Sequence, residues 1–126
     1  MKRNLAMGLI ASLLSLSSGA LAHHSGAMFD RSKEVTITGT VKEFNWTNPH
    51  ASFALEVTGQ AGAVDLWAIE MNPPTSLVRQ GWKRTTLKTG DKVTAVINPL
   101  RDGKPGGWYV GISLPDGTSL GGAAPH

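Results

Sequence analysis

The 126-residue chain contains no cysteine. Disulfide frameworks, thiolate zinc sites and cysteine nucleophiles are therefore excluded, and so is acylation of a lipoprotein terminus. Without disulfides a domain is held by its apolar core alone, and at this size one modest core is enough for that. The length favours a single domain over two.

Sequence signatures of hydrolases and nucleotide-binding enzymes are missing as well. The chain has no G-x-S-x-G elbow, no H-E-x-x-H helix and no P-loop. Ser25 follows His24, but a mobile lead-in does not hold a nucleophile and a base within hydrogen-bonding reach. Nothing in the sequence requires an enzyme, and a non-enzymatic function is favoured.

The excess of basic residues is small and lies partly at the N-terminus. Lys and Arg number 12 against 9 Asp and Glu, which gives a formal net charge of +3 at pH 7. Lys2 and Arg3 belong to a segment that we expect to be removed, and the remaining charges nearly balance. The composition therefore predicts no nucleic-acid partner.

Residues 1–22 have the pattern of a cleavable export signal. A positive start is followed by an uncharged, mostly apolar run at 5–16 and by Ala20-Leu21-Ala22, which fits the small-x-small cleavage pattern. The run is shorter than the roughly 20 residues that a membrane-spanning helix needs. We expect cleavage after Ala22, no stable membrane insertion, and a periplasmic or secreted mature protein.

Alternation of apolar and polar residues predicts a chain made mainly of β-strands. The first strand is predicted at 34–46, and its apolar parity shifts by one residue near Lys42-Glu43, which predicts a bulge. The further strands are predicted at 50–58, 63–71, 92–98 and 108–114.

A short helix is predicted between the third and fourth strands. It opens at the proline-rich stretch 72–75, carries Leu77, Val78 and Trp82 on its apolar face, and ends at Gly81. This order of elements predicts a five-stranded barrel of the oligonucleotide/oligosaccharide-binding (OB) type. An open β-meander or a small sandwich is the alternative. The expected parts are a signal at 1–22, a polar lead-in at 23–33, the barrel domain at 34–120 and a flexible tail at 121–126.

Histidine is concentrated at the expected mature N-terminus, where His23 and His24 would be the first two residues. A terminal histidine offers an α-amine and an imidazole nitrogen from one residue, and its amine loses its proton at modest cost near neutrality. Such nitrogen donors suit Cu(II). The sequence therefore indicates a site for copper or another transition metal, although a plain tail next to a cleavage site is the alternative.

The turn at 45–50, Asn-Trp-Thr-Asn-Pro-His, is the second cluster of interest. In OB barrels, the loop between the first two strands borders the ligand-binding side. His50 could supply another imidazole, and Met71 a soft thioether for Cu(I), with Met28 as a further auxiliary. The alternative is that Trp46 belongs to the barrel core and that His50 only forms a hydrogen bond within the turn.

Two other hypotheses compete with a metal-binding barrel. A metal-free module would bind a ligand or an envelope protein through the barrel rim around Trp46, Glu70 and Arg101, and it would need no cofactor. A copper-dependent redox enzyme would use the terminal histidine as its chelating ligand, but the mature domain is small and shows no evident substrate surface. The sequence leaves the oligomeric state open.

Several short motifs occur together in this chain. They are HHS at 23–25, VTITGTV at 35–41, NWTNPH at 45–50, WAIE at 67–70, LVRQGW at 77–82, GDKV at 90–93 and NPLRDG at 98–103. With this set the chain resembles a domain-of-unknown-function family, number 6152, of small exported bacterial proteins with His-His-Ser at the mature N-terminus. The resemblance covers nearly the whole expected mature chain. It implies a single periplasmic β-rich domain and no particular activity.

Overall fold

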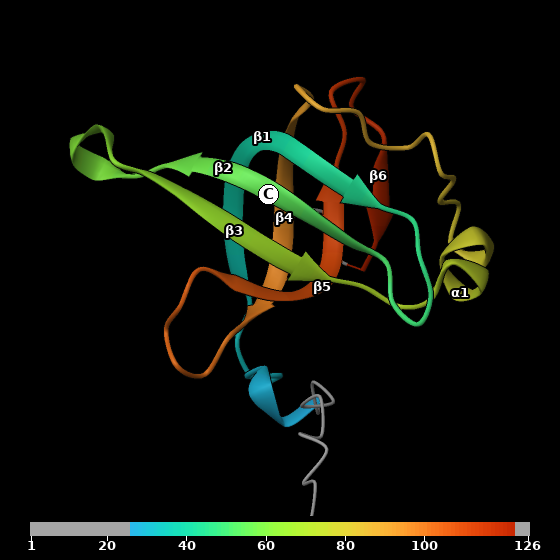
Figure 1. The fold of residues 1–126 in the computed structure, drawn as a ribbon, viewed down its shortest axis with the longest axis horizontal. Helices are drawn as coiled ribbons and strands as arrows, with labels where there is room; N and C mark the ends of the chain where they lie inside the picture. The colour runs from blue at the N-terminus through green and yellow to red at the C-terminus, as the bar shows by residue number, and fades with distance from the viewer. Residues whose placement is uncertain (1–25, 123–126) are drawn as a thin grey trace, which may run out of the picture.

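The computed structural model describes residues 26–122, which form a six-stranded sheet, two 3-10 turns and one short helix (Figure 1). The elements are η1 Gly26–Met28, β1 Val35–Asn45, β2 Ser52–Thr58, η2 Gln60–Gly62, β3 Val64–Glu70, α1 Pro74–Arg79, β4 Lys92–Pro99, β5 Gly106–Ser113 and β6 Ser119–Gly121. The expected signal segment lies outside the described residues. None of the helices in the described part of the chain has the length and apolar character that a membrane span requires.

The strands close into a barrel. Their order is β3-β2-β1-β4-β5-β6, and a parallel pairing of β3 with β5 joins the two sides of the sheet. Only three residue pairs make this closure, from Ala68 opposite Gly106 to Glu70 opposite Trp108. With α1 between β3 and β4, the prediction of a five-stranded OB-like barrel is confirmed, and β6 is an additional strand on β5.

β1 pairs with two neighbours because it bends at a bulge. Residues 35–40 pair with β4, and residues 40–45 pair with β2. The register against β2 shifts between Val41 and Glu43, where the parity shift in the sequence predicted a bulge. The extra residue increases the local twist, which lets one strand turn the corner of a small barrel.

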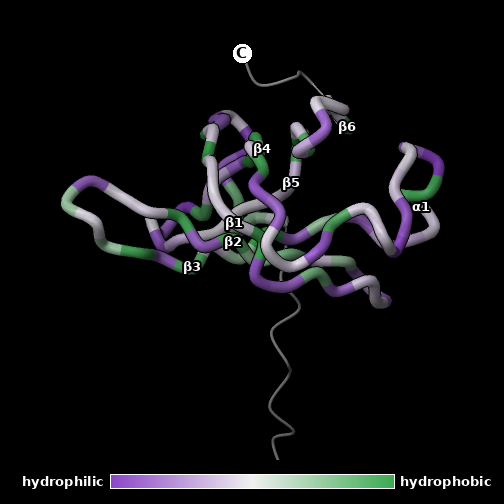
Figure 2. The backbone as a smooth tube through the Cα atoms, turned by 90° about the horizontal axis from the view of Figure 1, so that it is seen from above, coloured by the Kyte–Doolittle hydropathy of each residue, from purple (hydrophilic) through white to green (hydrophobic). Residues whose placement is uncertain are grey.

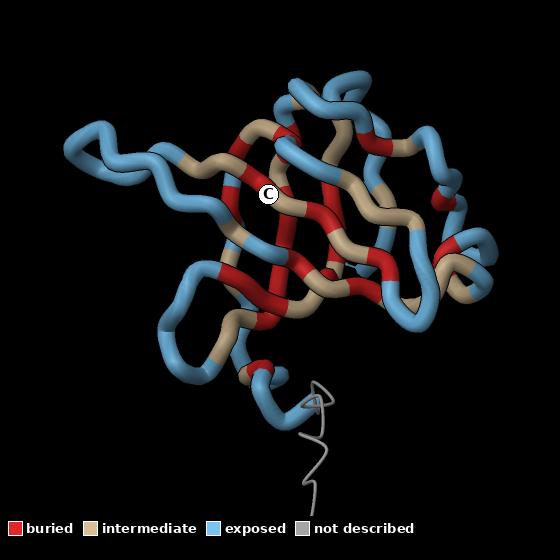
Figure 3. The backbone as a smooth tube through the Cα atoms, viewed as in Figure 1, coloured by how far each residue is buried: buried red, intermediate tan, exposed pale blue. Residues whose placement is uncertain are grey.

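The core lies inside the barrel and under α1 (Figure 3). Leu77 is the buried residue of α1, whereas Val78 is 59% exposed, so the prediction that Val78 faces the core is wrong. Trp82 is 1% exposed but follows the helix rather than belonging to it. Gly81 has a φ of 93°, and this left-handed conformation ends α1 as predicted.

Two segments outside the predicted strands pair with the barrel. β6 pairs with β5 as far as Gly121, the first residue of the expected tail. In the lead-in, Phe29 is 3% exposed and bridges to Leu100, and the N–H of Asp30 donates to the carbonyl of Pro99 at 2.8 Å. The described part of the lead-in is held in place because the Phe29 ring packs against the barrel.

Candidate functional site

Four side chains from distant parts of the chain meet on one side of the barrel: Phe29, Arg31, His50 and Trp108. We call them the Trp108 cluster. The ring centroids of Phe29 and His50 each lie 5.7 Å from that of Trp108, and the His50 ring stands edge-on at 89°. The guanidinium carbon of Arg31 lies 4.7 Å from the Trp108 ring centroid. The arrangement combines a cation–π contact with a tilted and an edge-on ring contact.

Strand alternation places Trp108 at the barrel surface. In β5 the side chain of Trp108 is half-buried, whereas the next residue, Tyr109, is buried in the core. The parallel pairing with β3 sets Trp108 beside Glu70, at the edge where the barrel closes. Trp108 therefore offers a surface ring to residues that arrive from other segments.

The turn after Phe29 brings Arg31 to this ring. The hydroxyl and the backbone N–H of Ser32 donate to one carboxylate oxygen of Asp30, at 2.6 and 3.1 Å. These bonds hold the pKa of Asp30 below its usual value, with the hydroxyl bond as the largest cause. The turn is thereby fixed, and Arg31 extends across Phe29 and Trp108.

His50 is exposed at the end of the turn between β1 and β2, just after the cis peptide bond Asn48-Pro49. Its carbonyl accepts a hydrogen bond from the Thr47 hydroxyl at 3.4 Å. Within residues 26–122 the His50 imidazole has a ring contact but no hydrogen bond. No hydrogen bond from the described residues therefore competes with a ligand for this imidazole.

The first described residues, Gly26–Met28 of η1, are anchored beside the Trp108 cluster. The N–H of Arg101 donates to the carbonyl of Met28 at 2.9 Å, and its Nε donates to the carbonyl of Ala27 at 3.0 Å. Together with the Phe29–Leu100 bridge, these bonds fix η1 on the loop after β4. Arg101, which was predicted as a rim residue, thus holds the backbone of η1 in place through hydrogen bonds to Ala27 and Met28.

The other predicted rim residues lie in different surroundings. Trp46 is half-buried and packs edge-on against Phe44 at 5.8 Å, next to the core. Glu70 is half-buried and ends β3. It borders a small apolar hollow of about 130 Å³ with Met28, Phe29, Ala68 and Leu100.

The structure describes only some of the residues that were predicted as metal ligands. His23 and His24 lie outside the described residues. Met71 is 0% exposed and belongs to the core, so its sulfur is not at the rim where we expected it. In the part of the chain from 26 to 122, no three His, Cys, Asp or Glu side chains gather closely enough to hold a metal ion. Of the predicted ligands within residues 26–122, His50 is exposed and the auxiliary Met28 is 38% exposed, whereas Met71 is buried.

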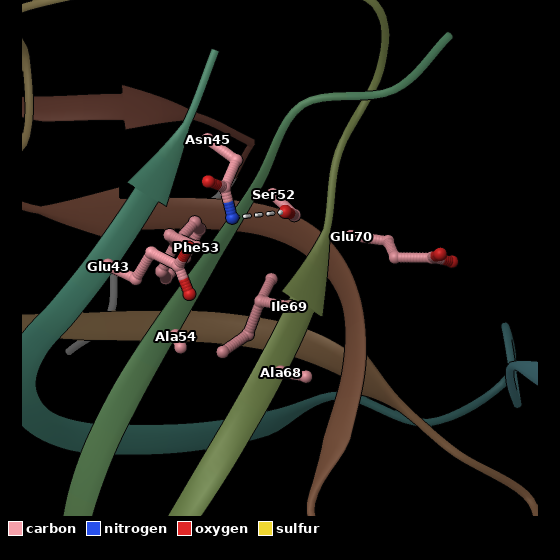
Figure 4. Close-up of a pocket in the computed structure, with 8 residues that line it drawn as sticks. All are labelled: Glu43, Asn45, Ser52, Phe53, Ala54, Ala68, Ile69 and Glu70. Atoms are coloured by element: carbon pink, nitrogen blue, oxygen red, sulfur yellow. Dashed lines mark hydrogen bonds between the residues drawn. The ribbon is translucent and has the colours of Figure 1, made fainter. Parts of the chain in front are cut away.

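The outer face of β1, β2 and β3 carries a shallow hollow of about 320 Å³ (Figure 4). Its polar lining is Glu43, Asn45, Ser52 and Glu70, and Asn45 Nδ2 donates to Ser52 Oγ at 3.4 Å. Figure 4 shows Glu70 turned away from Asn45 and Ser52. No Lys or Arg lines the hollow, and Phe53, the aromatic residue that borders it, is buried in the core.

Sequence reasoning missed Phe29, Arg31 and Trp108 as a group. In the sequence, Trp108 stands at the start of a predicted strand and Arg31 in the lead-in, and neither position has a local pattern that points to the other. The contacts depend on the β3–β5 closure and on the docking of the lead-in, which join residues distant in sequence. Met71 did carry a usable pattern, because it shares the parity of Ile69, which pairs with the buried Phe53.

Comparisons with known proteins agree with this fold. A family profile matches residues 10–109, and the chain belongs to that family, a family of unknown function (DUF6152). A search of the curated proteins finds no significant match. Among solved structures, the chain is similar to the mitochondrial single-stranded DNA-binding protein Rim1 of S. cerevisiae. The sequence identity is 12% and the TM-score 0.50, over 66% of this chain and 93% of that one, which is a likeness of fold alone.

Proposed function

We propose that this member of the DUF6152 family is an exported, non-enzymatic barrel protein that binds Cu(II) at its mature N-terminus. The ligands are the α-amine and imidazole of His23, the imidazole of His24, and His50 from the barrel. The observation that carries the proposal is the anchoring of residues 26–30 beside the Trp108 cluster, on the side of the barrel where His50 is exposed.

The reach of the chain is sufficient for these ligands to meet. Two residues lie between His23 and Gly26, and an extended chain covers about 3.3–3.6 Å per residue. Phe29, at the end of the anchored segment, and His50 each contact the same Trp108 ring at 5.7 Å. The anchoring of the described segment and the position of His50 beside the same ring support a site that combines the terminal histidines with His50.

The chemistry of the donors selects the metal. One amine and up to three neutral imidazoles form a nitrogen-rich set, and nitrogen donors in a tetragonal arrangement favour Cu(II) over the other first-row divalent ions. With Met71 in the core, its thioether is not available as a soft ligand, and the exposed Met28 is a single thioether beside several nitrogen donors, so Cu(II) is preferred to Cu(I). Binding releases protons from the amine and the imidazoles, so affinity is expected to fall as the pH is lowered.

The test compares three forms of the protein by thermal unfolding with Cu(II), Zn(II) and a chelator. The first form begins at His23, the second carries one extra alanine before His23, and the third is His50→Ala. At a free Cu(II) concentration of about 100 times Kd, the first form should gain about 2.7 kcal/mol in its free energy of unfolding. The extended form should respond much less because its α-amine is no longer part of the chelate.

His126→Ala is the matched control, since it removes a histidine that the proposal does not use. It should bind Cu(II) as the unaltered protein does, whereas His50→Ala should bind more weakly. An extended form that responds to Cu(II) as strongly as the processed form refutes the terminal chelate. Mass spectrometry of the exported protein tests the premise, because any first residue other than His23 removes the proposed ligand set.

A further inference from the structure

The first half of β3 has a free edge. β3 pairs with β2 along its whole length, but β5 covers its other edge only from Ala68 to Glu70. Residues 64–67 therefore have a strand neighbour on one side only. Figure 1 shows this part of β3 in the β2–β3 hairpin, which projects away from the barrel.

The hydrogen-bond pattern shows which backbone groups are free. The N–H of Gly59 donates to the carbonyl of Ala63, and the N–H of Met71 donates to that of Ala51, so odd-numbered residues of this segment bond to β2. The register has no shift between these points, and antiparallel pairs alternate along a ladder. Val64 and Leu66 therefore turn their N–H and C=O groups to the free edge, where nothing in residues 26–122 pairs with them.

The side chains at this edge are unusually apolar for a surface. Val64 is 60% exposed and Leu66 is 58% exposed, and Figure 2 shows hydrophobic positions on the projecting part of β3. Natural proteins commonly protect an edge strand with lysine, proline or a bulge. The stretch 64–67 has none of these, and its one charged residue is the exposed Asp65.

A second copy of this chain fits the edge poorly. In a symmetric antiparallel pair, the register that uses Val64 and Leu66 of both copies pairs Val64 with Leu66 and sets Asp65 opposite Asp65. Like charges directly opposite each other destabilise a strand pair. A shift by two residues toward the barrel sets Val64 opposite Ala68, whose edge β5 already covers. These two registers are therefore disfavoured, whereas a different chain with a basic residue opposite Asp65 meets neither obstacle.

We propose that residues 64–67 form a docking edge for an extended segment of a partner protein, which adds a strand to β3. The segment carries a basic residue opposite Asp65 and apolar residues beside Val64 and Leu66. The charge of Asp65 supports this choice, because its side chain is exposed and forms no ion pair with a basic side chain of residues 26–122, whereas the nearby Glu56 is already paired with Lys42 at 3.2 Å. Backbone hydrogen bonds supply affinity in such strand addition, and the alternating side chains supply specificity.

The experiment titrates the protein with a capped synthetic peptide, Thr-Val-Lys-Val-Thr, and follows backbone amide shifts by NMR. Shifts should change at residues 64–67, and amide exchange at Val64 and Leu66 should slow on binding. The matched peptide has glutamate in place of lysine and should bind more weakly. Equal binding of the two peptides, or shifts confined to another surface, overturns the proposal.

Leu66→Pro is the sharpest variant because it removes an edge donor that β2 does not use. Proline is tolerated in strands where the N–H faces outward. Leu66→Ala, which keeps the N–H, is its control. Loss of one backbone bond should weaken the lysine peptide by about three- to tenfold relative to Leu66→Ala. If Leu66→Pro binds the peptide as tightly as Leu66→Ala does, strand addition is wrong.

Asp65→Lys tests the charge requirement without altering the backbone. It should reverse the preference, so that the glutamate peptide binds more tightly than the lysine peptide. An unchanged preference refutes the role of Asp65. Sedimentation tests whether a second copy occupies the edge instead. If the unaltered protein dimerises and Leu66→Pro abolishes the dimer, the edge binds a second copy and the proposal is wrong.

Discussion

Tyr109 should ionise far above the usual range of a tyrosine. It is the single tyrosine of the chain, and its buried hydroxyl accepts a hydrogen bond from Trp82 Nε1 at 3.2 Å. Burial raises the pKa of Tyr109 from 10.0 to about 12, because the phenolate would lose its hydration, and the Trp82 bond lowers it by less. We therefore expect the Tyr109 hydroxyl of the folded protein to lose its proton at a higher pH than an ordinary tyrosine does.

The raised pKa links stability to pH with a definite sign. Between about pH 10 and 12 the folded state keeps the phenol proton that the unfolded state has released, so the free energy of unfolding falls as the pH rises. The contribution is fully present below the unfolded pKa and is lost as the pH rises through the folded pKa. Two pKa units correspond to about 2.7 kcal/mol, of which about 1.4 kcal/mol is lost by about pH 11.

The phenolate absorbance of Tyr109 measures this directly, since no other tyrosine contributes. The native protein should titrate near 12, and the protein in urea should titrate near its ordinary value. Urea unfolding of Tyr109→Phe should lack the part of the alkaline loss that tyrosine causes, although lysines still contribute. A native titration midpoint equal to that in urea would refute the burial of the Tyr109 hydroxyl.

Two further predictions concern packing, and both can be measured by urea unfolding. Leu77→Ala should lower the free energy of unfolding by about 2–5 kcal/mol because it empties the space under α1, whereas the exposed Val78→Ala should change it by less than about 0.5 kcal/mol. Equal effects would show that α1 does not close the barrel. Gly107→Ala should destabilise strongly, since a Cβ there would overlap the carbonyl oxygen of Asn98. Gly59→Ala, whose Cβ would have its nearest neighbour at 3.6 Å, should be well tolerated.

The strands and the bulge could be predicted because they depend on local alternation. In β1, one face holds the buried Ile37 and Val41, and the change of parity after Val41 marks the corner of the barrel. A half-buried strand in any such barrel needs the same period of two. The position of α1 followed from the proline-rich start and from Gly81, both of which are local constraints as well.

The details that failed depend on which neighbours meet in space. A helix of six residues buries little, so Leu77 fills the core while the adjacent Val78 faces solvent. Trp82 reaches the core from beyond Gly81, and its partner is Tyr109 on β5. Periodicity does not carry that information, because the same residues would satisfy several packings of a short helix on a barrel.

The short β3–β5 closure explains why both proposed surfaces exist. The pairing begins at Ala68 and Gly106, so residues 64–67 are left with an uncovered edge. The same pairing sets Trp108 at the barrel rim, where it meets the anchored Phe29 and the turn residue His50. The two proposals can therefore fail separately: peptide binding should be insensitive to His50→Ala, and Cu(II) binding should be insensitive to Leu66→Pro.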